Sequence, residues 1–317
     1  MAIMLWISGK YPIPMDSAYK SEVWDHFGKY RRDPSLRRLK NTETFPDMTE
    51  VGLLLSDFPE IRIDVPAKCK WYEVVKGKEN MVAVLNDAKA FAKISGFWKF
   101  WNKHRSTYAD IENRSLADLR EKEVLPAVDR FFHSAATGRQ PEVTVYLEPL
   151  NNWGAHAIDF EKLRGEPNGD RISFQIGPTE QDEQFPDSAL VFKINRSMTQ
   201  NVWHEASHNY LRRSLKENTD RIKKLERLFK SSPELYSQNI KSWDYAFEEN
   251  LVRSIVAVIT RDKFGEESFQ REISAQRQRS FLYVPEIAEM ISKQYSSSFN
   301  SFDEFVPHIL SMLEEKP

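Results

Sequence analysis

The most informative stretch of the 317-residue sequence is NVWHEASHNY, residues 201–210. It contains the pattern His-Glu-x-x-His, formed by His204, Glu205 and His208. Residues four apart lie on the same face of an α-helix, so both imidazoles can point at one metal ion. Glu205 follows His204 directly and can reach a water on that ion without binding the ion itself. The stretch therefore predicts a zinc site on a helix.

The flanking sequence favours a long helix around this motif. No proline or glycine interrupts the chain from Ser197 to Asn218. Ser197 and Gln200 also have the Ser-x-x-Gln spacing of a capping box, in which the two side chains satisfy the first free backbone amides of a helix. Apart from Glu205, the residues around the two histidines are uncharged, which is typical of a helix that lies under a cleft; they are Val202, Ala206, Ser207 and Asn209. An exposed pair of surface histidines is the less favoured interpretation.

A catalytic zinc site needs a third protein ligand and one open position. The metzincin arrangement would continue with a glycine and a third histidine at fixed spacing, and this chain has neither there. The gluzincin arrangement takes a glutamate from a later helix, and residues 243–255 are predicted to form one. Glu249 is the preferred ligand and Glu248 the alternative. Arg253 shares a helix face with Glu249, so we expect its guanidinium to hold that carboxylate in place.

Outside the motif, the sequence predicts an α+β, predominantly helical fold. Apolar residues recur at helical spacing through the first 135 residues and again from residue 197 almost to the end. Between them, β-branched and aromatic residues alternate with polar ones, which predicts strands at residues 143–147, 155–160, 171–176 and 189–194. We expect a mainly helical N-terminal region, residues 1–135, and a zincin-like catalytic region, residues 136–317. The latter would hold a small mixed or antiparallel sheet next to the active-site helix.

The composition narrows the possible partners. Lys and Arg number 45 and Asp and Glu 47, so a net charge of −2 predicts no field that would attract nucleic acid. No run approaches the roughly 20 apolar residues needed to span a bilayer. Cys69 is the single cysteine, which excludes a disulfide within the chain and a cysteine-based metal site. Residues 1–8 are apolar but too short for the core of an export signal, so we expect either a cytoplasmic protein or an exported one whose signal has been removed.

The sequence from Met4 to its end resembles an uncharacterised bacterial family that is catalogued as a domain of unknown function and regarded as gluzincin-type zinc metallopeptidases. The specific match is the motif from His204 to His208. Looser matches are the Trp24-x-x-Phe27 region with Tyr30-Arg31, the aromatic run from Phe97 to Tyr108, Glu249-x-x-x-Arg253, and the tail from Phe281 to Pro285. The resemblance implies that His204, His208 and Glu249 are the zinc ligands and that Glu205 is the base. Export is frequent in this family, which favours an exported protein over a cytoplasmic one and leaves both alternatives open.

We therefore expect a zinc-dependent metallopeptidase that binds one Zn²⁺ per chain and acts on a peptide or protein. In this hypothesis a zinc-bound water, activated by Glu205, hydrolyses the peptide bond. The alternatives are a zinc hydrolase that acts on a non-peptide bond and a catalytically inactive binding protein with the same fold. The donor that stabilises the oxyanion stays open among Tyr283, Tyr245, Arg253, His156 and His308.

Overall fold

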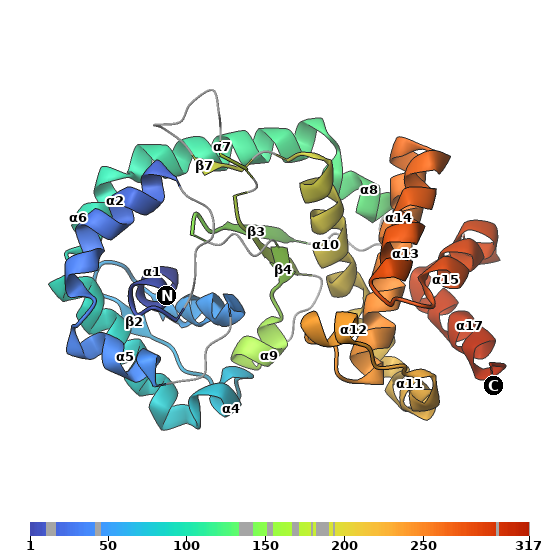
Figure 1. Ribbon diagram of the computed structural model, residues 1–317, viewed down its shortest axis with the longest axis horizontal. Helices are drawn as coiled ribbons and strands as arrows, with labels where there is room; N and C mark the ends of the chain where they lie inside the picture. The colour runs from blue at the N-terminus through green and yellow to red at the C-terminus, as the bar shows by residue number, and fades with distance from the viewer. Residues whose placement is uncertain are drawn as a thin grey trace. The chain divides into compact units, whose positions relative to one another are not determined.

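The computed structural model describes residues 1–10, 17–41, 46–132, 142–150, 155–166, 171–178, 180–181, 190–192, 194–295 and 298–316. Over these ranges the fold is α+β and predominantly helical, as the sequence predicts (Figure 1). None of the helices in the described ranges has both the length and the hydrophobicity to cross a bilayer.

Contacts group the chain into two compact units. Unit 1 consists of Met1–Glu121, Thr144–Gly169 and Ser173–Met198, and unit 2 of Lys122–Val143, Asp170–Ile172 and Thr199–Pro317. The units alternate along the chain because segments distant in sequence pack together. The expected boundary between residues 135 and 136 lies outside the described residues, and the division into two sequence regions stays a prediction.

Unit 1 combines helices with short strands around an apolar core that is rich in phenylalanine. Its α-helices are α1 (Ala2–Ile7), α2 (Ala18–Phe27), α3 (Arg37–Lys40), α4 (Trp71–Val75), α5 (Lys78–Ile94), α6 (Phe97–Lys103), α7 (Arg105–Glu121) and α9 (Phe160–Arg164). The 3₁₀ turns are η1 (Gly28–Tyr30), η2 (Pro34–Leu36) and η3 (Pro46–Leu54). Phe27 lies at the centre of the core, with ring centroids 5.0 Å from Phe100 and 6.0 Å from Phe91. The aromatic residues of the N-terminal part therefore serve largely to pack helices together.

The two long helices α2 and α5 begin in different ways. Ser17 caps α2 by accepting a hydrogen bond from the Lys20 amide at 3.0 Å. Helix α5 begins at Lys78, directly after Gly77, and no side chain caps it.

The strands form small sheets. They are β1 (Leu55–Ser56), β2 (Arg62–Ile63), β3 (Val143–Leu147), β4 (Ala155–Ala157), β5 (Ile172–Ile176), β6 (Glu180–Gln181) and β7 (Leu190–Val191). In the three-stranded sheet β5 is central, with β3 and β4 beside it, and β4 pairs antiparallel with β5 so that His156 lies opposite Gln175. Every residue of β5 is buried, as expected for a central strand covered on both faces.

Two of the four predicted strands are confirmed by β3 and β5. The strand expected at residues 155–160 ends at Ala157, because the side chain of Asp159 accepts the Lys162 amide at 3.2 Å and starts α9. The strand expected at residues 189–194 is present only as β7, which pairs with β6. Residues 189 and 193 lie outside the described ranges.

Unit 2 is almost entirely helical. It contains α8 (Val124–Phe131), most of α10 (Arg196–Glu217), α11 (Thr219–Lys224), α12 (Pro233–Ser237), α13 (Trp243–Phe264), α14 (Glu266–Gln278), α15 (Val284–Met290) and α17 (Phe302–Glu314). A 3₁₀ turn at Glu226–Leu228 and a π-helical turn at Ile291–Tyr295 complete it. The long helix α13 packs against α14 and α15 (Figure 1). It is buried along most of its length, so it forms the centre of the unit.

Candidate metal centre

The predicted motif lies within α10, the uninterrupted helix expected around it. The helix begins differently from the expectation, because Asn195 caps it: its Oδ1 accepts the Met198 amide at 2.9 Å. Ser197 is therefore already inside the helix, and the predicted capping box is wrong. The side chain of Gln200 is instead directed to Thr260 and Glu272, at 3.1 Å from each.

One face of α10 anchors the helix in unit 2. Trp203 is fully buried, and its indole N–H donates to the carbonyl of Val124 at 2.8 Å. Ser207 is also fully buried and bonds to the Trp203 carbonyl one turn earlier. Residues 203 and 207 are each one position before a motif histidine, so their burial fixes the rotation of the helix and directs His204 and His208 away from this core.

The helix α13 supplies the carboxylate of Glu249. Trp243, the first residue of α13, is buried and donates its indole N–H to the carbonyl of Ile222 at 2.8 Å. Phe247 and Leu251, on either side of Glu249, are fully buried. Glu249 itself is only 5% exposed. A carboxylate in such surroundings needs close positive or hydrogen-bonding partners, since burial of an unpaired charge is costly.

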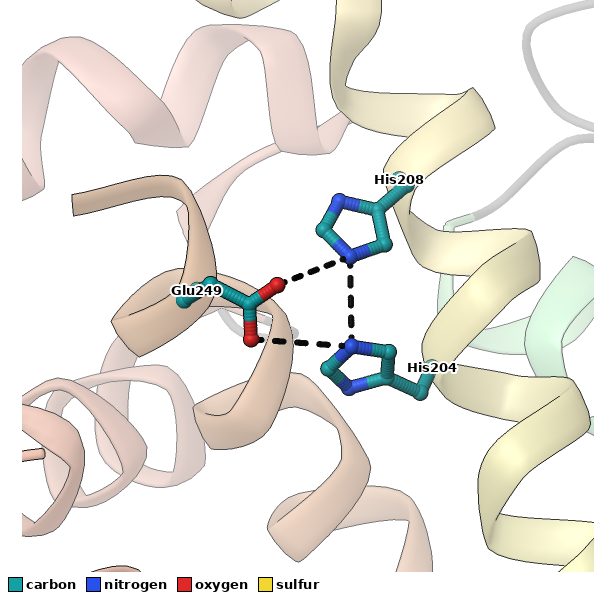
Figure 2. Close-up of side chains that lie close together, drawn as sticks. All are labelled: His204, His208 and Glu249. Atoms are coloured by element: carbon teal, nitrogen blue, oxygen red, sulfur yellow. Dashed lines mark hydrogen bonds and ion pairs between the residues drawn. The ribbon is translucent and has the colours of Figure 1, made fainter. Parts of the chain in front are cut away.

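The side chains of His204, His208 and Glu249 converge on one point (Figure 2). The Nε2 atoms of the two imidazoles lie 3.2 Å apart. Oε2 of Glu249 lies 3.6 Å from Nε2 of His204, and Oε1 lies 3.4 Å from Nε2 of His208. Among the residues that the structure describes, these three form the one group of three or more histidine, cysteine or acidic side chains whose ligand atoms lie within 4.8 Å of one another.

These separations fit the coordination shell of zinc. Ligand atoms held tetrahedrally at about 2.0–2.1 Å from Zn²⁺ are about 3.3–3.4 Å from one another. The separation of 3.2 Å between the two Nε2 atoms is close to that value. Each oxygen of Glu249 faces one imidazole, Oε1 at 3.4 Å from His208 and Oε2 at 3.6 Å from His204, and with one ligand atom taken from each residue all three lie within 4.8 Å of one another. Two imidazole nitrogens and one carboxylate oxygen are also the donor types that zinc accepts at sites with an open fourth position. The chemistry of the donor set and its spacing therefore both suit one zinc ion.

The two adjacent acids of α13 have different partners. Glu249 faces Nε2 of both imidazoles, whereas Oε1 of Glu248 lies 2.7 Å from Nδ1 of His208, on the opposite side of that ring. A carboxylate at the second ring nitrogen fixes the tautomer and orientation of a metal-binding histidine. The geometry thus separates the two candidates: Glu249 is placed to be the ligand, and Glu248 is placed to orient His208.

Arg253 contacts Glu249, as expected from their spacing. Its Nε and Nη2 lie 2.9 and 2.8 Å from Oε2 of Glu249. The guanidinium carbon lies 4.0 Å from the ring centroid of Phe281, and Nη1 donates to Oε1 of Gln276 at 3.0 Å. The arginine is therefore held from three sides, and one of these partners, Gln276, was not selected from the sequence. The spacing of Glu272 and Gln276, four residues apart on one helix, is the one sequence signal that could have drawn attention to it.

The electrostatics of the centre depend on its acidic side chains. Burial disfavours a charged imidazole at His208, yet hydrogen bonds to Glu248 and Glu249 outweigh burial and raise its pKa well above the ordinary value. Burial likewise opposes ionisation of Glu249, but His204, His208 and Arg253 together hold its pKa well below the ordinary value. The carboxylates thus draw positive charge to the point where the three ligand atoms meet.

Two of the oxyanion donor candidates interact with this centre: Arg253, which contacts Glu249, and Tyr245. Burial and the negative charges of Glu249, Glu248 and Glu205 raise the pKa of its phenol, so the hydroxyl keeps its proton. The motif glutamate, Glu205, is 8% exposed.

The other candidates are engaged elsewhere. Tyr283 donates its hydroxyl to the carbonyl of Leu228 at 2.8 Å, and His308 bonds to Gln294 at 2.7 Å. His156 belongs to unit 1, where its Nε2 lies 3.3 Å from Glu50. None of these contacts involves a residue of the metal centre, and the roles of all site residues stay predictions.

Comparisons with known proteins identify the family. Residues 45–312 match the family described as Domain of unknown function (DUF4932), and the chain belongs to it because the match covers most of its length. No curated protein and no solved structure matches the sequence.

Proposed function

We propose that the protein is a zinc-dependent metallopeptidase of the gluzincin type. The observation that carries the proposal is the convergence of His204, His208 and Glu249, with ligand atoms all within 4.8 Å of one another. The order of these residues supports it further, since a His-Glu-x-x-His helix followed by a glutamate from a later helix is the gluzincin arrangement. Zinc in this set would polarise the scissile carbonyl and lower the pKa of a water towards about 7.

The residues of the chain would then supply the proton transfers. Glu205 accepts a proton from the attacking water as the water oxygen bonds to the carbonyl carbon. It returns that proton to the leaving nitrogen when the carbon–nitrogen bond breaks. Burial suits Glu205 to this task, because a carboxylate that is largely shielded from solvent exchanges its proton with the reactants rather than with bulk water.

Tyr245 is our proposed oxyanion donor. Its phenol keeps its proton because burial and three neighbouring carboxylates raise its pKa. A protonated phenol can donate a hydrogen bond to the negative oxygen that develops on the carbonyl. The side chain is also 41% exposed, so a substrate entering from solvent can meet it.

The substitution Glu205→Gln tests the proposal directly. It removes the proton acceptor but keeps the shape, so turnover of a peptide library should fall on the order of 10²- to 10⁴-fold. The zinc content should stay at one ion per chain, since Glu205 is not a ligand. Glu217→Gln is the matched control, because Glu217 is an exposed residue of the same helix whose partner is Arg213. Undiminished turnover in Glu205→Gln would remove this residue from the mechanism.

Metal analysis of the wild-type protein separates the peptidase from its alternatives. Stoichiometric zinc with chelator-sensitive cleavage of peptides supports the proposal. Stoichiometric zinc without cleavage of any library peptide would favour a hydrolase for another bond or an inactive binding protein. Purified protein that never takes up zinc would exclude both zinc hydrolases and leave the inactive binding protein.

A further inference from the structure

A line of polar side chains leads from Glu249 away from the metal centre and returns to α10. Arg253 contacts Glu249 and donates to Oε1 of Gln276. The amide of Gln276 in turn donates to Oε1 of Glu272, and Oε2 of Glu272 accepts from Gln200 at 3.1 Å. These residues come from α13, α14 and α10, so three helices of unit 2 share one hydrogen-bonded chain.

This polar chain ends on α10, the helix of the His-Glu-x-x-His motif. Gln200 lies one turn before His204 on α10, so its side chain ties the start of the histidine-bearing segment to α14. The same amide lies 3.1 Å from the hydroxyl of Thr260 on α13. The polar chain therefore connects the helix of the two histidines with the helix of the glutamate by a route outside the ligands themselves.

The hydrogen bonds of this polar chain are costly to break because several of its members are buried. Gln276 is 4% exposed and Thr260 is fully buried. The side chain of Arg253 is 14% exposed. Breaking one bond would leave a buried donor or acceptor without a partner, which costs more than an exposed hydrogen bond contributes. The charged ends, Arg253 and Glu272, also make each bond charge-assisted and hence strongly directional.

We infer that Gln276, Glu272 and Gln200 are positioning residues, which hold Arg253 and through it the carboxylate of Glu249. With Oε2 of Glu249 occupied by the guanidinium, Oε1 faces Nε2 of His208 at 3.4 Å. A carboxylate that is fixed in this way presents Oε1 to His208 and Oε2 to His204 before any metal arrives. This inference rests on the proposed function, because its purpose is to preorganise the metal site.

An exchange of the two side chains provides a sharp test. Gln276→Leu removes the acceptor for Arg253, so zinc affinity should fall on the order of 10- to 100-fold. The double variant E272Q/Q276E can restore every bond, with donor and acceptor reversed only between positions 272 and 276. The carboxylate introduced at position 276 would accept from Arg253 and from the amide introduced at position 272, whose oxygen would still accept from Gln200. The double variant should return zinc affinity towards that of the wild type. Gln270→Leu is the matched control, an exposed glutamine of the same helix whose partner is Glu266.

Two measurements read out these variants. Competition with a chromophoric chelator gives zinc affinity, and the absorption spectrum of the Co²⁺-substituted protein reports ligand geometry. Unchanged affinity and spectrum in Gln276→Leu would overturn the inference, as would a double variant no better than the single one. A merely structural role would lower thermal stability in Gln276→Leu without altering the Co²⁺ spectrum.

A metal-free readout keeps the inference separate from the proposed function. In the protein without metal, the Nε–H signal of Arg253 should be sharp and slow to exchange in the wild type and the double variant, and broadened in Gln276→Leu. A wild-type protein that binds no zinc would remove the proposed function, while the Arg253 signal would still decide whether this chain orders the arginine. An Nε–H signal that is the same in all variants would end the inference.

Discussion

Each unit contains a buried glutamate beside a histidine, Glu50 in unit 1 and Glu249 in unit 2, and different side chains balance the charge of each. In unit 1, Glu50 is 1% exposed, with Nζ of Lys70 at 2.8 Å from Oε2 and Nε2 of His156 at 3.3 Å from Oε1. Burial would raise the pKa of Glu50, but His156 and Lys70 together lower it. In unit 2, Glu249 faces two imidazoles as well as a guanidinium.

The clusters around Glu50 and Glu249 differ in how many side chains surround the buried glutamate and in how the additional carboxylates are neutralised. Near Glu249, the carboxylate of Glu248 lies 2.7 Å from His208, and the negative charges of Glu248, Glu249 and Glu205 all raise the pKa of Tyr245. In unit 1, the second acid is Glu148, and burial raises its pKa to about 7. The unit 1 cluster can thus relieve its excess charge by binding a proton. In the unit 2 cluster the pKa of Glu249 is instead held well below its ordinary value, and a divalent cation would balance the charge of this carboxylate.

Removing one imidazole from each cluster should give the largest difference in zinc binding between the two units. We expect His204→Ala to abolish zinc binding, because two ligands do not form a stable site. We expect His156→Ala to keep one zinc per chain, since its ring contacts Glu50 and not the centre in unit 2. Metal analysis after dialysis measures both, with circular dichroism to verify folding. Zinc loss in His156→Ala alone would reverse the assignment of the two clusters.

Zinc should also stabilise the protein through unit 2. At a free concentration of about 1,000 times the dissociation constant, one site contributes about 4 kcal/mol to the free energy of unfolding. Chelator should lower the melting temperature of the wild type accordingly. His204→Ala serves as the control, because it has no site to lose. An equal response to chelator in both proteins would show that zinc acts elsewhere.

The smallest expected effect is the pH dependence of stability that arises from Glu148 in unit 1. Burial raises the pKa of Glu148 from 4.5 to about 7, against the opposing charges of the Met1 amino group and His156. The folded state therefore holds a proton that the unfolded state releases between pH 4.5 and 7, so stability is lost as pH rises through this window. Glu148→Gln removes this titration. The difference in the free energy of unfolding between the variant and the wild type should therefore shift by about 1–3 kcal/mol in favour of the variant as the pH rises from about 4.5 to 7.5.

Denaturant titrations at several pH values measure this difference. Glu60→Gln, an exposed substitution in the same unit, is the control and should show no such trend. A stability difference between Glu148→Gln and the wild type that does not vary with pH would refute the raised pKa. Zinc affinity at fixed pH should be the same in Glu148→Gln and the wild type, because Glu148 belongs to the other cluster.

Much of this protein could be predicted from local sequence patterns. The fold class followed from helical and alternating periodicity, because these patterns reflect which face of an element is buried. The candidate ligands His204 and His208 followed from their spacing, since one helical turn brings positions i and i+4 onto one face. The contact between Glu249 and Arg253 followed from the same rule.

The packing of helices decided what spacing could not. Glu248 and Glu249 are adjacent acids, and only the rotation of α13, set by buried residues such as Trp243 and Phe247, determines which one faces both imidazoles. The polar chain behind Arg253 likewise depends on a bond between Gln200 and Glu272, which are 72 positions apart in sequence. Long-range contacts of this kind arise when separate helices pack against one another, and no local pattern records them.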